Sequence, residues 1–227
     1  RYGDAYHYYN TNLDKSNIYG ATICLYFFIV GFLAVCFRFF DLSGINRILF
    51  KYKIVNYFRG YCTLPTLNSS HAAYFTYASI INGLLPTRLE SLVIAGYVVL
   101  NTVLLSVFYD IDPYNIVFES KSLQYARLVG DRSGIIAIAH LPLIILLSSR
   151  NSFLEFLTGF KYTTAIALHK WIGRGMVIDV CVHSIAYTTY ALLSNSFTMS
   201  QKELYWRFGV CGTAVTICLC FFSLGVV

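Results

Sequence analysis

The chain has 227 residues, of which 57% are hydrophobic and 12% are charged, and its mean hydropathy is +0.59. Soluble domains carry about 25% charged residues, so this composition excludes an ordinary soluble domain and favours a membrane protein. The formal net charge of +6 would suit nucleic acid, but the basic residues are scattered among apolar runs. We therefore expect membrane lipid as a partner and no nucleic acid.

Five apolar stretches are long enough to cross a bilayer, which takes about 20 residues in a helix. In chain order they cover residues 19–40, 91–109, 133–149, 164–193 and 208–227. Their apolar residues are continuous rather than alternating, which indicates helices. The sequence thus predicts an all-α fold, a polytopic bundle of membrane helices. The cysteines form no CxxC motif, and we expect reduced thiols.

The link between the first two stretches is basic, with six Lys and Arg residues from Arg38 to Arg88. By the positive-inside rule it lies in the cytoplasm, and the next link, 110–132, lies outside. Within the basic link, residues 45–60 alternate basic and aromatic side chains, which suits an interfacial helix and a plain loop equally. The glycosylation pattern at Asn68 is then cytoplasmic, so we expect it to be unmodified.

The fourth stretch carries two histidines, His169 and His183, which are 14 positions apart. At about 100° and 1.5 Å per residue, both imidazoles lie on one helix face, roughly 21 Å apart along the axis. Ionisable side chains at membrane depth are costly and usually mark a functional site. The spacing suits two haem irons stacked across the membrane. The alternative is that each histidine only hydrogen-bonds a neighbouring helix.

Other ionisable side chains accompany this pair. Lys170 and Arg174 lie near the inner boundary, where they can snorkel to the surface or pair with haem propionates. Asp179 is deeper and needs a partner, such as a nearby Arg or hydroxyl. His140, on the third stretch, is favoured as a hydrogen-bonding core residue over an axial ligand.

Several motifs occur together in the second half of the chain. They are PTRLESL (86–92), DRSG (131–134), LPLIILLSSRNSFLEFLTG (141–159) and HKWIGR (169–174), which is followed by His183. In this order and at these distances they resemble the fungal ferric reductase family, whose transmembrane haem domain is shared with the NADPH oxidases. The resemblance covers roughly residues 85–227, and the preceding part is weaker but consistent.

The resemblance implies transfer of electrons from cytosolic NADPH, through FAD and two b-type haems, to ferric or cupric chelates outside. By position, His169 matches an inner-haem ligand and His183 an outer-haem ligand, and Arg174 is a candidate cofactor-binding residue. In the family each haem is held by one histidine from each of two helices. The second such helix, FAD and NADPH are expected beyond Val227, so this chain half-ligates each haem and would be inactive alone. Outer-sphere electron transfer requires no acid–base catalyst, and we assign none.

The domain organisation that follows has three parts. Residues 1–18 form an N-terminal exterior segment, 19–84 the first membrane helix with its basic cytoplasmic link, and 85–227 a partial ferric-reductase-like transmembrane haem domain. Two alternative functions stay open: a superoxide-generating, NADPH-oxidase-like protein, and a non-enzymatic membrane transporter or scaffold subunit. The expected location is the plasma membrane. A vacuolar or other internal membrane, and assembly into a homo-oligomer, are left open.

Overall fold

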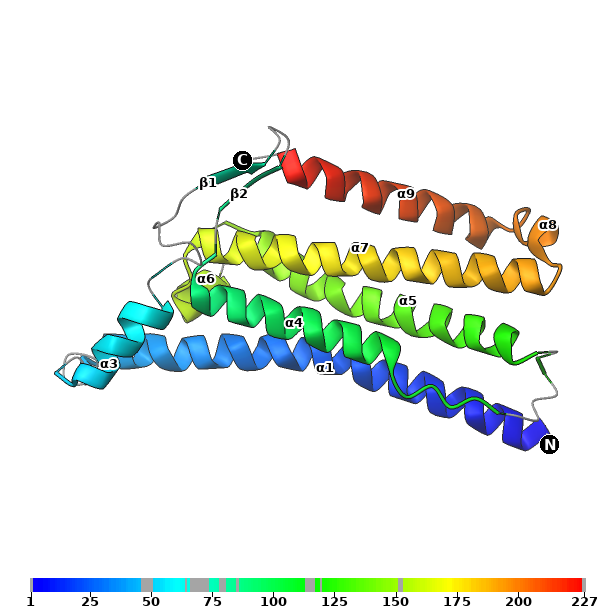
Figure 1. The fold of residues 1–227 in the computed structure, drawn as a ribbon, viewed down its shortest axis with the longest axis horizontal. Helices are drawn as coiled ribbons and strands as arrows, with labels where there is room; N and C mark the ends of the chain where they lie inside the picture. Colours follow the sequence, from blue (N-terminus) through cyan, green and yellow to red (C-terminus); the bar gives the residue numbers. More distant parts are fainter. Residues whose placement is uncertain are drawn as a thin grey trace. The chain divides into compact units, whose positions relative to one another are not determined.

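The computed structural model describes residues 2–45, 51–63, 65, 74–77, 81–84, 86–112, 117–118, 120–150 and 153–225. The long elements of this part are the helices α1 (Tyr2–Leu42), α4 (Arg88–Ser106), α5 (Lys121–Ser148), α7 (Tyr162–Leu193) and α9 (Leu204–Gly225), drawn in Figure 1. Shorter elements accompany them: α3 (Lys53–Phe58), the π-helix η1 (Arg59–Thr63), α6 (Phe153–Thr158), α8 (Phe197–Ser200), and the strands β1 (Tyr74–Tyr77) and β2 (Ile81–Leu84). The two strands form an antiparallel hairpin.

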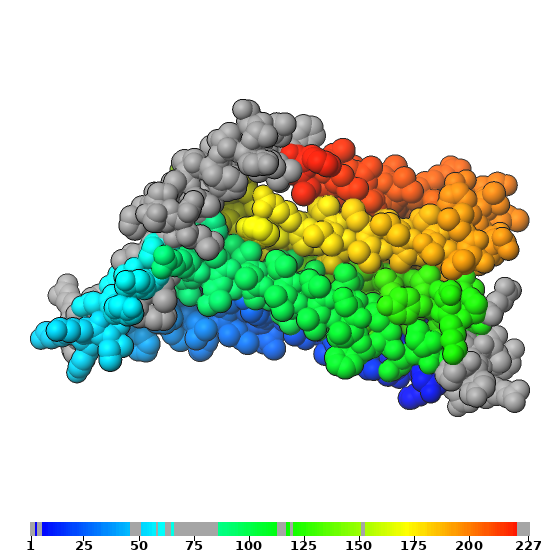
Figure 2. Space-filling model, in the orientation of Figure 1, coloured from blue at the N-terminus to red at the C-terminus, as the bar shows by residue number. Residues whose placement is uncertain are grey.

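All five long helices are long and apolar enough to cross a membrane. This confirms the predicted all-α polytopic bundle, and the chain is a multi-pass membrane protein. The exposed side chains agree with it: α4, whose surface is green in Figure 2, exposes Leu92, Val99 and Val103. In a bilayer such side chains contact lipid. Among the described residues, Cys24, Cys36, Cys181, Cys211, Cys218 and Cys220 form no disulfide.

Two helices begin well before the apolar stretches that predicted them. Helix α1 starts at Tyr2 rather than at residue 19, and α5 starts at Lys121 rather than at 133. Hydrogen bonds hold the polar turns of α1: Asn12 Nδ2 donates to the Asp110 carbonyl over 2.8 Å, and the Asp110 amide donates to Asn12 Oδ1 over 3.1 Å. No break in α1 marks the boundary expected at residue 18. The link between α4 and α5, expected at 110–132, ends at residue 120 because α5 begins at Lys121.

The basic link contains more regular structure than a loop. Residues 53–58 are helical, and the β1–β2 hairpin adds strands that the sequence did not predict. Residues 46–50, the glycosylation pattern at Asn68 and His71 lie outside the described residues. The side of the membrane on which the link lies stays a prediction.

Side chains satisfy the backbone groups at the ends of α4. At its start, the Thr87 amide donates to Glu90 Oε2 over 2.8 Å and the Glu90 amide donates to Thr87 Oγ1 over 3.3 Å, which is a capping box. Beyond its end, the buried Arg132 donates to the carbonyls of Val107 and Phe108. Phe108 has a φ of 60°, a left-handed conformation that ends the helix.

Arg132 also stacks on an aromatic ring. Its guanidinium lies 3.6 Å from the centre of the Tyr109 ring. Burial raises the pKa of Tyr109 to about 12, so its phenol stays neutral and donates to the Leu105 carbonyl. Arg132 therefore joins α5 to the segment that follows α4.

The chain divides into two compact units. The first comprises Arg1–Ile23, Leu100–Leu141 and Arg174–Cys220, and the second comprises Cys24–Val99, Pro142–Gly173 and Phe221–Val227. Each long helix except α9 contributes substantial portions to both units.

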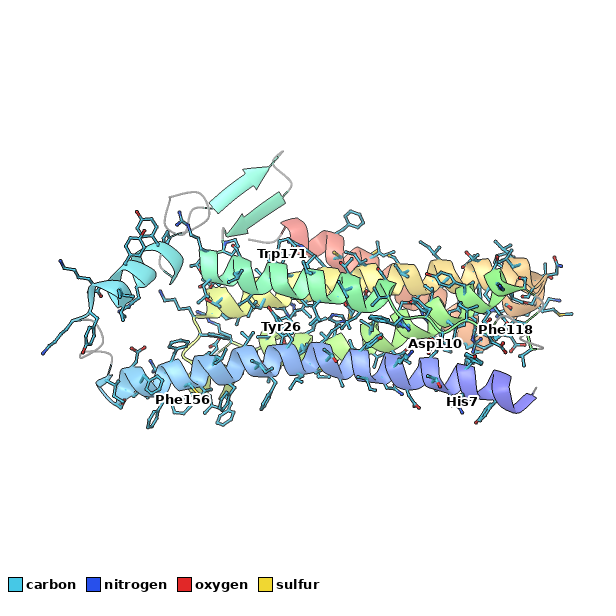
Figure 3. The ribbon with its side chains drawn as sticks, turned by 60° about the horizontal axis from the view of Figure 1, so that its bottom comes forward. His7, Tyr26, Asp110, Phe118, Phe156 and Trp171 are labelled. Carbon is cyan, nitrogen blue, oxygen red and sulfur yellow. The ribbon has the colours of Figure 1, made fainter. Side chains whose placement is uncertain are left out.

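In the second unit, α1, α4 and α7 are joined through aromatic side chains. The Tyr26 hydroxyl donates to the Val93 carbonyl of α4 over 2.8 Å, and Figure 3 labels this tyrosine on α1. Tyr97 packs against Phe27, with ring centres 5.3 Å apart, and its hydroxyl reaches the Ile172 carbonyl of α7 at 3.5 Å. These contacts join α1 and α4 to the first part of α7, residues 162–173.

Candidate functional site

His183 lies on α7 and is anchored by the backbone of α5. Its Nδ1 atom is 2.7 Å from the carbonyl oxygen of Gly130. A carbonyl oxygen only accepts hydrogen bonds, so Nδ1 carries a hydrogen, and in the neutral imidazole Nε2 then has the lone pair. This is the tautomer that a neutral histidine needs in order to bind a metal through Nε2, with a backbone carbonyl fixing the ring.

Two glycines of α5 make room for this arrangement. A Cβ atom at Gly134 would lie 2.7 Å from His183 Nδ1, and one at Gly130 would lie 2.5 Å from the Tyr187 ring. Real Cβ atoms do not approach so closely, so both positions require glycine for the helices to pack as they do. The pattern Gly130-x-x-x-Gly134 is the small-residue spacing that lets membrane helices approach each other. Sequence reasoning missed this signal.

His183 also lines a cavity of about 770 Å³ within the first unit. Its walls come mainly from α7 and α9, and Ser184 of α7 is hydrogen-bonded to Thr213 of α9 over 2.8 Å. Arg127 of α5 also lines it, together with Tyr187 and aromatic residues near the start of α9. The cavity is large, mostly apolar and bordered by one cationic side chain, which suits a large aromatic cofactor bearing carboxylates.

Arg127 is held in place by a network that joins three helices. Its Nε donates to Asp131 Oδ2 over 3.2 Å, and its guanidinium lies 5.0 Å from the centre of the Tyr187 ring. The hydroxyls of Tyr187 and Tyr9 both donate to the Asp131 carboxylate. Sequence reasoning placed Arg127 in an exterior link, because the first turns of α5 are polar.

His169 repeats the arrangement of His183 in the second unit. Its Nδ1 atom lies 3.0 Å from the Ile144 carbonyl oxygen, again on α5, so its Nε2 likewise keeps a lone pair. The ring is half-buried. Both predicted ligands thus lie on the unbroken helix α7, and each is oriented by a carbonyl of the same neighbouring helix.

The donor set fits axial ligation of haem. One neutral imidazole per site, with Nδ1 tied to a carbonyl, is what a haem iron takes from one side. Within the described residues, no group of three or more His, Cys, Asp or Glu side chains is placed to hold a metal ion. His169 and His183 therefore stand as two separate single ligands, and their role in binding haem stays a prediction.

Arg174 lies on α7 between the two histidines and is half-buried. Its expected role with a propionate or phosphate stays a prediction. Lys170, one residue after His169, is half-buried as well.

The partners of Asp179 differ from those expected. Asp179 is fully buried, and it contacts Asn101 of α4 and His140 of α5 rather than an Arg or a hydroxyl. These partners lie on other helices, so no local pattern could reveal them. His140 is itself fully buried and its Nδ1 contacts the Ile136 carbonyl at 2.8 Å.

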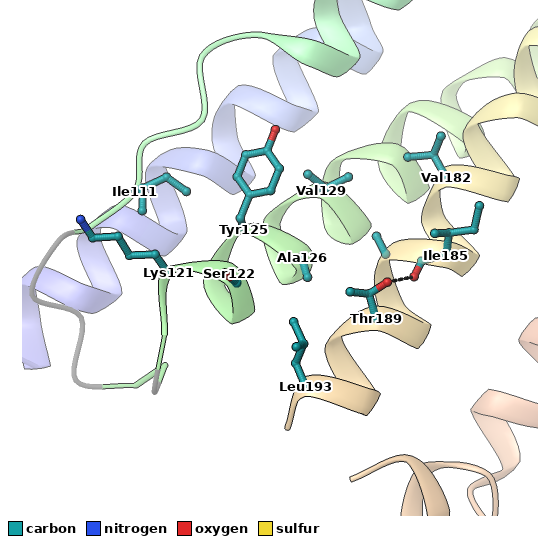
Figure 4. A pocket seen from close by; sticks show the side chains of 11 residues that line it. Ile111, Lys121, Ser122, Tyr125, Ala126, Val129, Val182, Ile185, Thr189 and Leu193 are labelled. Atoms are coloured by element: carbon teal, nitrogen blue, oxygen red, sulfur yellow. Dashed lines mark hydrogen bonds between the residues drawn. The ribbon is translucent and has the colours of Figure 1, made fainter. Parts of the chain in front are cut away.

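A second hollow, of about 830 Å³, opens between α5 and α7 in the first unit (Figure 4). Apolar side chains such as Val129 and Val182 line it, and Thr189, which donates to the Ile185 carbonyl of its own helix, turns its polar group away from the hollow. Neither predicted ligand borders it, so it is not part of the candidate site.

These features define a polytopic helical membrane protein that presents two anchored imidazoles on one membrane-spanning helix. The family described as "ferric reductase like transmembrane component" matches residues 133–227. The chain is 46% identical to "Ferric/cupric reductase transmembrane component 2" of Saccharomyces cerevisiae, over 99% of this chain and 32% of that protein. It is 31% identical to "Ferric/cupric reductase transmembrane component 1" of Candida albicans, over 96% of this chain and 29% of that protein. No solved structure matches the chain.

The chain therefore belongs to the fungal ferric reductase family, as its motifs indicated. It spans about a third of the length of the curated relatives that it matches.

Proposed function

We propose that the whole protein is a ferric-chelate reductase that carries electrons from cytosolic NADPH, through FAD and two b-type haems, to ferric or cupric chelates outside the cell. The observation that carries this proposal is the anchoring of His169 and His183, each through Nδ1, to a carbonyl of α5. Two imidazoles on one helix, each with a free Nε2, are suited to two irons at different depths of a membrane.

When bound, the haems supply the one-electron carriers of this path. The chain's own residues hold and orient them. His183 and His169 provide one nitrogen ligand each, and the α5 carbonyls prevent the rings from presenting Nδ1 instead. Arg127, which lines the same cavity as His183, would neutralise carboxylates of the outer haem. Arg174 is proposed for the same task or for a phosphate. The mostly apolar lining of the cavity lowers the polarity around the group that it holds, which influences the potential of that group.

The remaining parts of the path lie outside these residues in our proposal. The rest of the whole protein would bind FAD and NADPH, and it would supply the second histidine ligand of each haem. The names of the relatives mention ferric and cupric reduction, which supports a metal chelate as the acceptor. The plasma membrane is the proposed location, because an external chelate is reached from there.

The visible spectrum of the full-length purified protein tests the haem sites. We expect the bands of reduced low-spin haem b with two haems per chain. His169→Ala and His183→Ala should each lose one haem, whereas His7→Ala, which changes an exposed histidine of α1, should keep both. A protein without these bands, or with unchanged haem content in both variants, would refute the proposal.

The acceptor is tested on whole cells that express the full-length protein. Ferrous chelate and superoxide are measured in parallel, with NADPH supplied by the cytosol. Ferrous product that persists when superoxide dismutase is added supports direct metal reduction. Product that disappears with the dismutase would instead assign oxygen as the acceptor, as in the NADPH oxidases.

A further inference from the structure

Three polar side chains from three helices meet in the interior of the first unit. Asp179 of α7 and His140 of α5 are both 0% exposed, and Asn101 of α4 is 7% exposed. Asn101 Nδ2 lies 3.1 Å and 3.2 Å from the two carboxylate oxygens of Asp179. His140 Nδ1 lies 3.6 Å from Asp179 Oδ2. All three positions belong to helices that are candidates for crossing the membrane.

The charge of this cluster is not balanced by a cation. Among the described residues, no Lys or Arg side chain lies within ion-pairing distance of Asp179, and the one possible ion-pair partner is His140. Yet 3.6 Å is too long for a hydrogen bond, and His140 Nδ1 is directed to the Ile136 carbonyl at 2.8 Å. On α7 itself the nearest Lys, Arg or His side chains are Arg174 and His183, five residues before and four after Asp179, and the Cys181 thiol lies two residues after it. A bare carboxylate in this apolar interior would be strongly disfavoured.

Asn101 gives an independent indication. Its Oδ1 atom is buried and accepts no hydrogen bond within the part of the chain that the structure describes. A carboxylate beside it has no hydrogen to give, whereas a protonated carboxyl has one. A small rotation of the amide would then close a ring of two hydrogen bonds, from Asn101 Nδ2 to one carboxyl oxygen and from the carboxyl O–H to Asn101 Oδ1. Protonation of Asp179 thus satisfies the amide oxygen and removes the unbalanced charge together.

We propose that Asp179 and Asn101, with His140 beside them, form a proton-binding site inside the membrane, where the Asp179 carboxyl holds one proton shared with Asn101 Oδ1. The site is a neutral acid–amide pair at neutral pH. His140 stays a neutral imidazole that donates from Nδ1 to the Ile136 carbonyl.

A consequence follows for electron transfer, and this step rests on the proposed function. An electron that enters the membrane interior adds a negative charge, which strengthens the hold of a nearby carboxyl on its proton. Each electron that leaves removes that charge again. At neutral pH the proton would therefore stay on Asp179 in both redox states, but it would be held more tightly in the reduced protein. The C=O stretching frequency of the carboxyl should then differ between the oxidised and the reduced protein.

Infrared spectroscopy of the full-length protein in detergent tests the site directly. We expect the C=O stretching band of a protonated carboxyl at neutral pH, with a shift to lower frequency in D₂O. Asp179→Asn should remove the band. Asp110→Asn should keep it, because Asp110 is a half-exposed carboxylate paired with Lys15. Asn101→Leu should move the band to higher frequency, because the carboxyl then loses its hydrogen-bond partner.

The Asn101→Leu measurement keeps the test valid if Asp179→Asn fails to fold. A wild-type spectrum without a protonated-carboxyl band would overturn the proposal, and so would a band that neither variant alters. The difference spectrum between oxidised and reduced protein then tests the redox response, and an unchanged band would overturn that step. Absence of haem bands in the visible spectrum would refute the proposed function while leaving the static infrared result unaffected.

Discussion

The Nδ1 atom of His183 lies 2.7 Å from the carbonyl oxygen of Gly130, on a neighbouring helix and 53 residues earlier in the chain. This contact fixes both the tautomer and the direction of the imidazole. It depends on the close approach of α5 and α7, which two glycines permit.

Gly134→Ala should displace His183. The added Cβ would lie 2.7 Å from Nδ1, so the ring or the helix has to move. We expect the full-length variant to lose the haem assigned to His183 while keeping the one assigned to His169, as measured by haem content and by the low-spin spectrum. Gly31→Ala, at a helical position with nothing within 4 Å, is the matched control and should keep both haems. Equal spectra for the two variants would contradict the prediction.

Arg132→Met should destabilise the first unit. The substitution keeps an apolar stem of similar length but leaves the carbonyls of Val107 and Phe108 without their donors. Loss of a buried hydrogen-bond partner costs about 1–3 kcal/mol. Thermal unfolding in detergent should therefore begin at a clearly lower temperature. Arg207→Met, at an exposed arginine that contacts only the Gln201 carbonyl in the described residues, should leave the unfolding temperature nearly unchanged.

Thr87→Ala should weaken the start of α4. It removes the side-chain oxygen that accepts from the Glu90 amide in the capping box, at a cost of about 1 kcal/mol. Chemical unfolding in mixed detergent micelles measures the loss. Thr22→Ala removes a hydroxyl that contacts only a carbonyl of its own helix, and it should cost less. A larger loss in the control would show that the cap is not what stabilises this end.

Arg127→Gln should lower the midpoint potential of the haem assigned to His183. Arg127 borders the cavity of that histidine, and removing a positive charge disfavours the added electron of the reduced state. We expect a fall of tens of millivolts in a spectroelectrochemical titration of the full-length protein, with the other haem nearly unaffected. Lys202→Gln removes an exposed charge and should change neither potential. A rise in the potential after Arg127→Gln would contradict the assignment.

The sequence predicts the membrane helices because hydrophobic length is a property of a continuous segment. It underestimates α1 and α5 because their polar turns gain stability from distant partners: Asn12 of α1 bonds to Asp110, and Asp131 of α5 accepts from Tyr9. No pattern within either segment reports such a partner. The same reason hides the hairpin, whose strands are only four residues each.

The candidate site divides in the same way. The apolar stretch predicts that His169 and His183 share a helix, their 14-residue spacing predicts that they share a face of it, and the motif order indicates the family. The partners of the two rings are backbone carbonyls of α5, which no residue type identifies. The partners of Asp179 are an amide and an imidazole on two other helices, where composition alone suggested an Arg or a hydroxyl. For the contact between α5 and α7, the sequence does contain one recognisable signal, the Gly130-x-x-x-Gly134 spacing.

The carbonyls of Gly130 and Ile144, which hold the two histidines, require α5 and α7 to keep the same number of residues between their contact points. Gly130 and Ile144 are 14 positions apart on α5, and the histidines that they hold are 14 positions apart on α7. Deleting one residue between either pair would turn the remainder of that helix by about 100° and shift it by about 1.5 Å. One imidazole would then lose its carbonyl while the other kept it. These two segments can therefore exchange many side chains during evolution, but an insertion or deletion in one of them alone would detach a ligand.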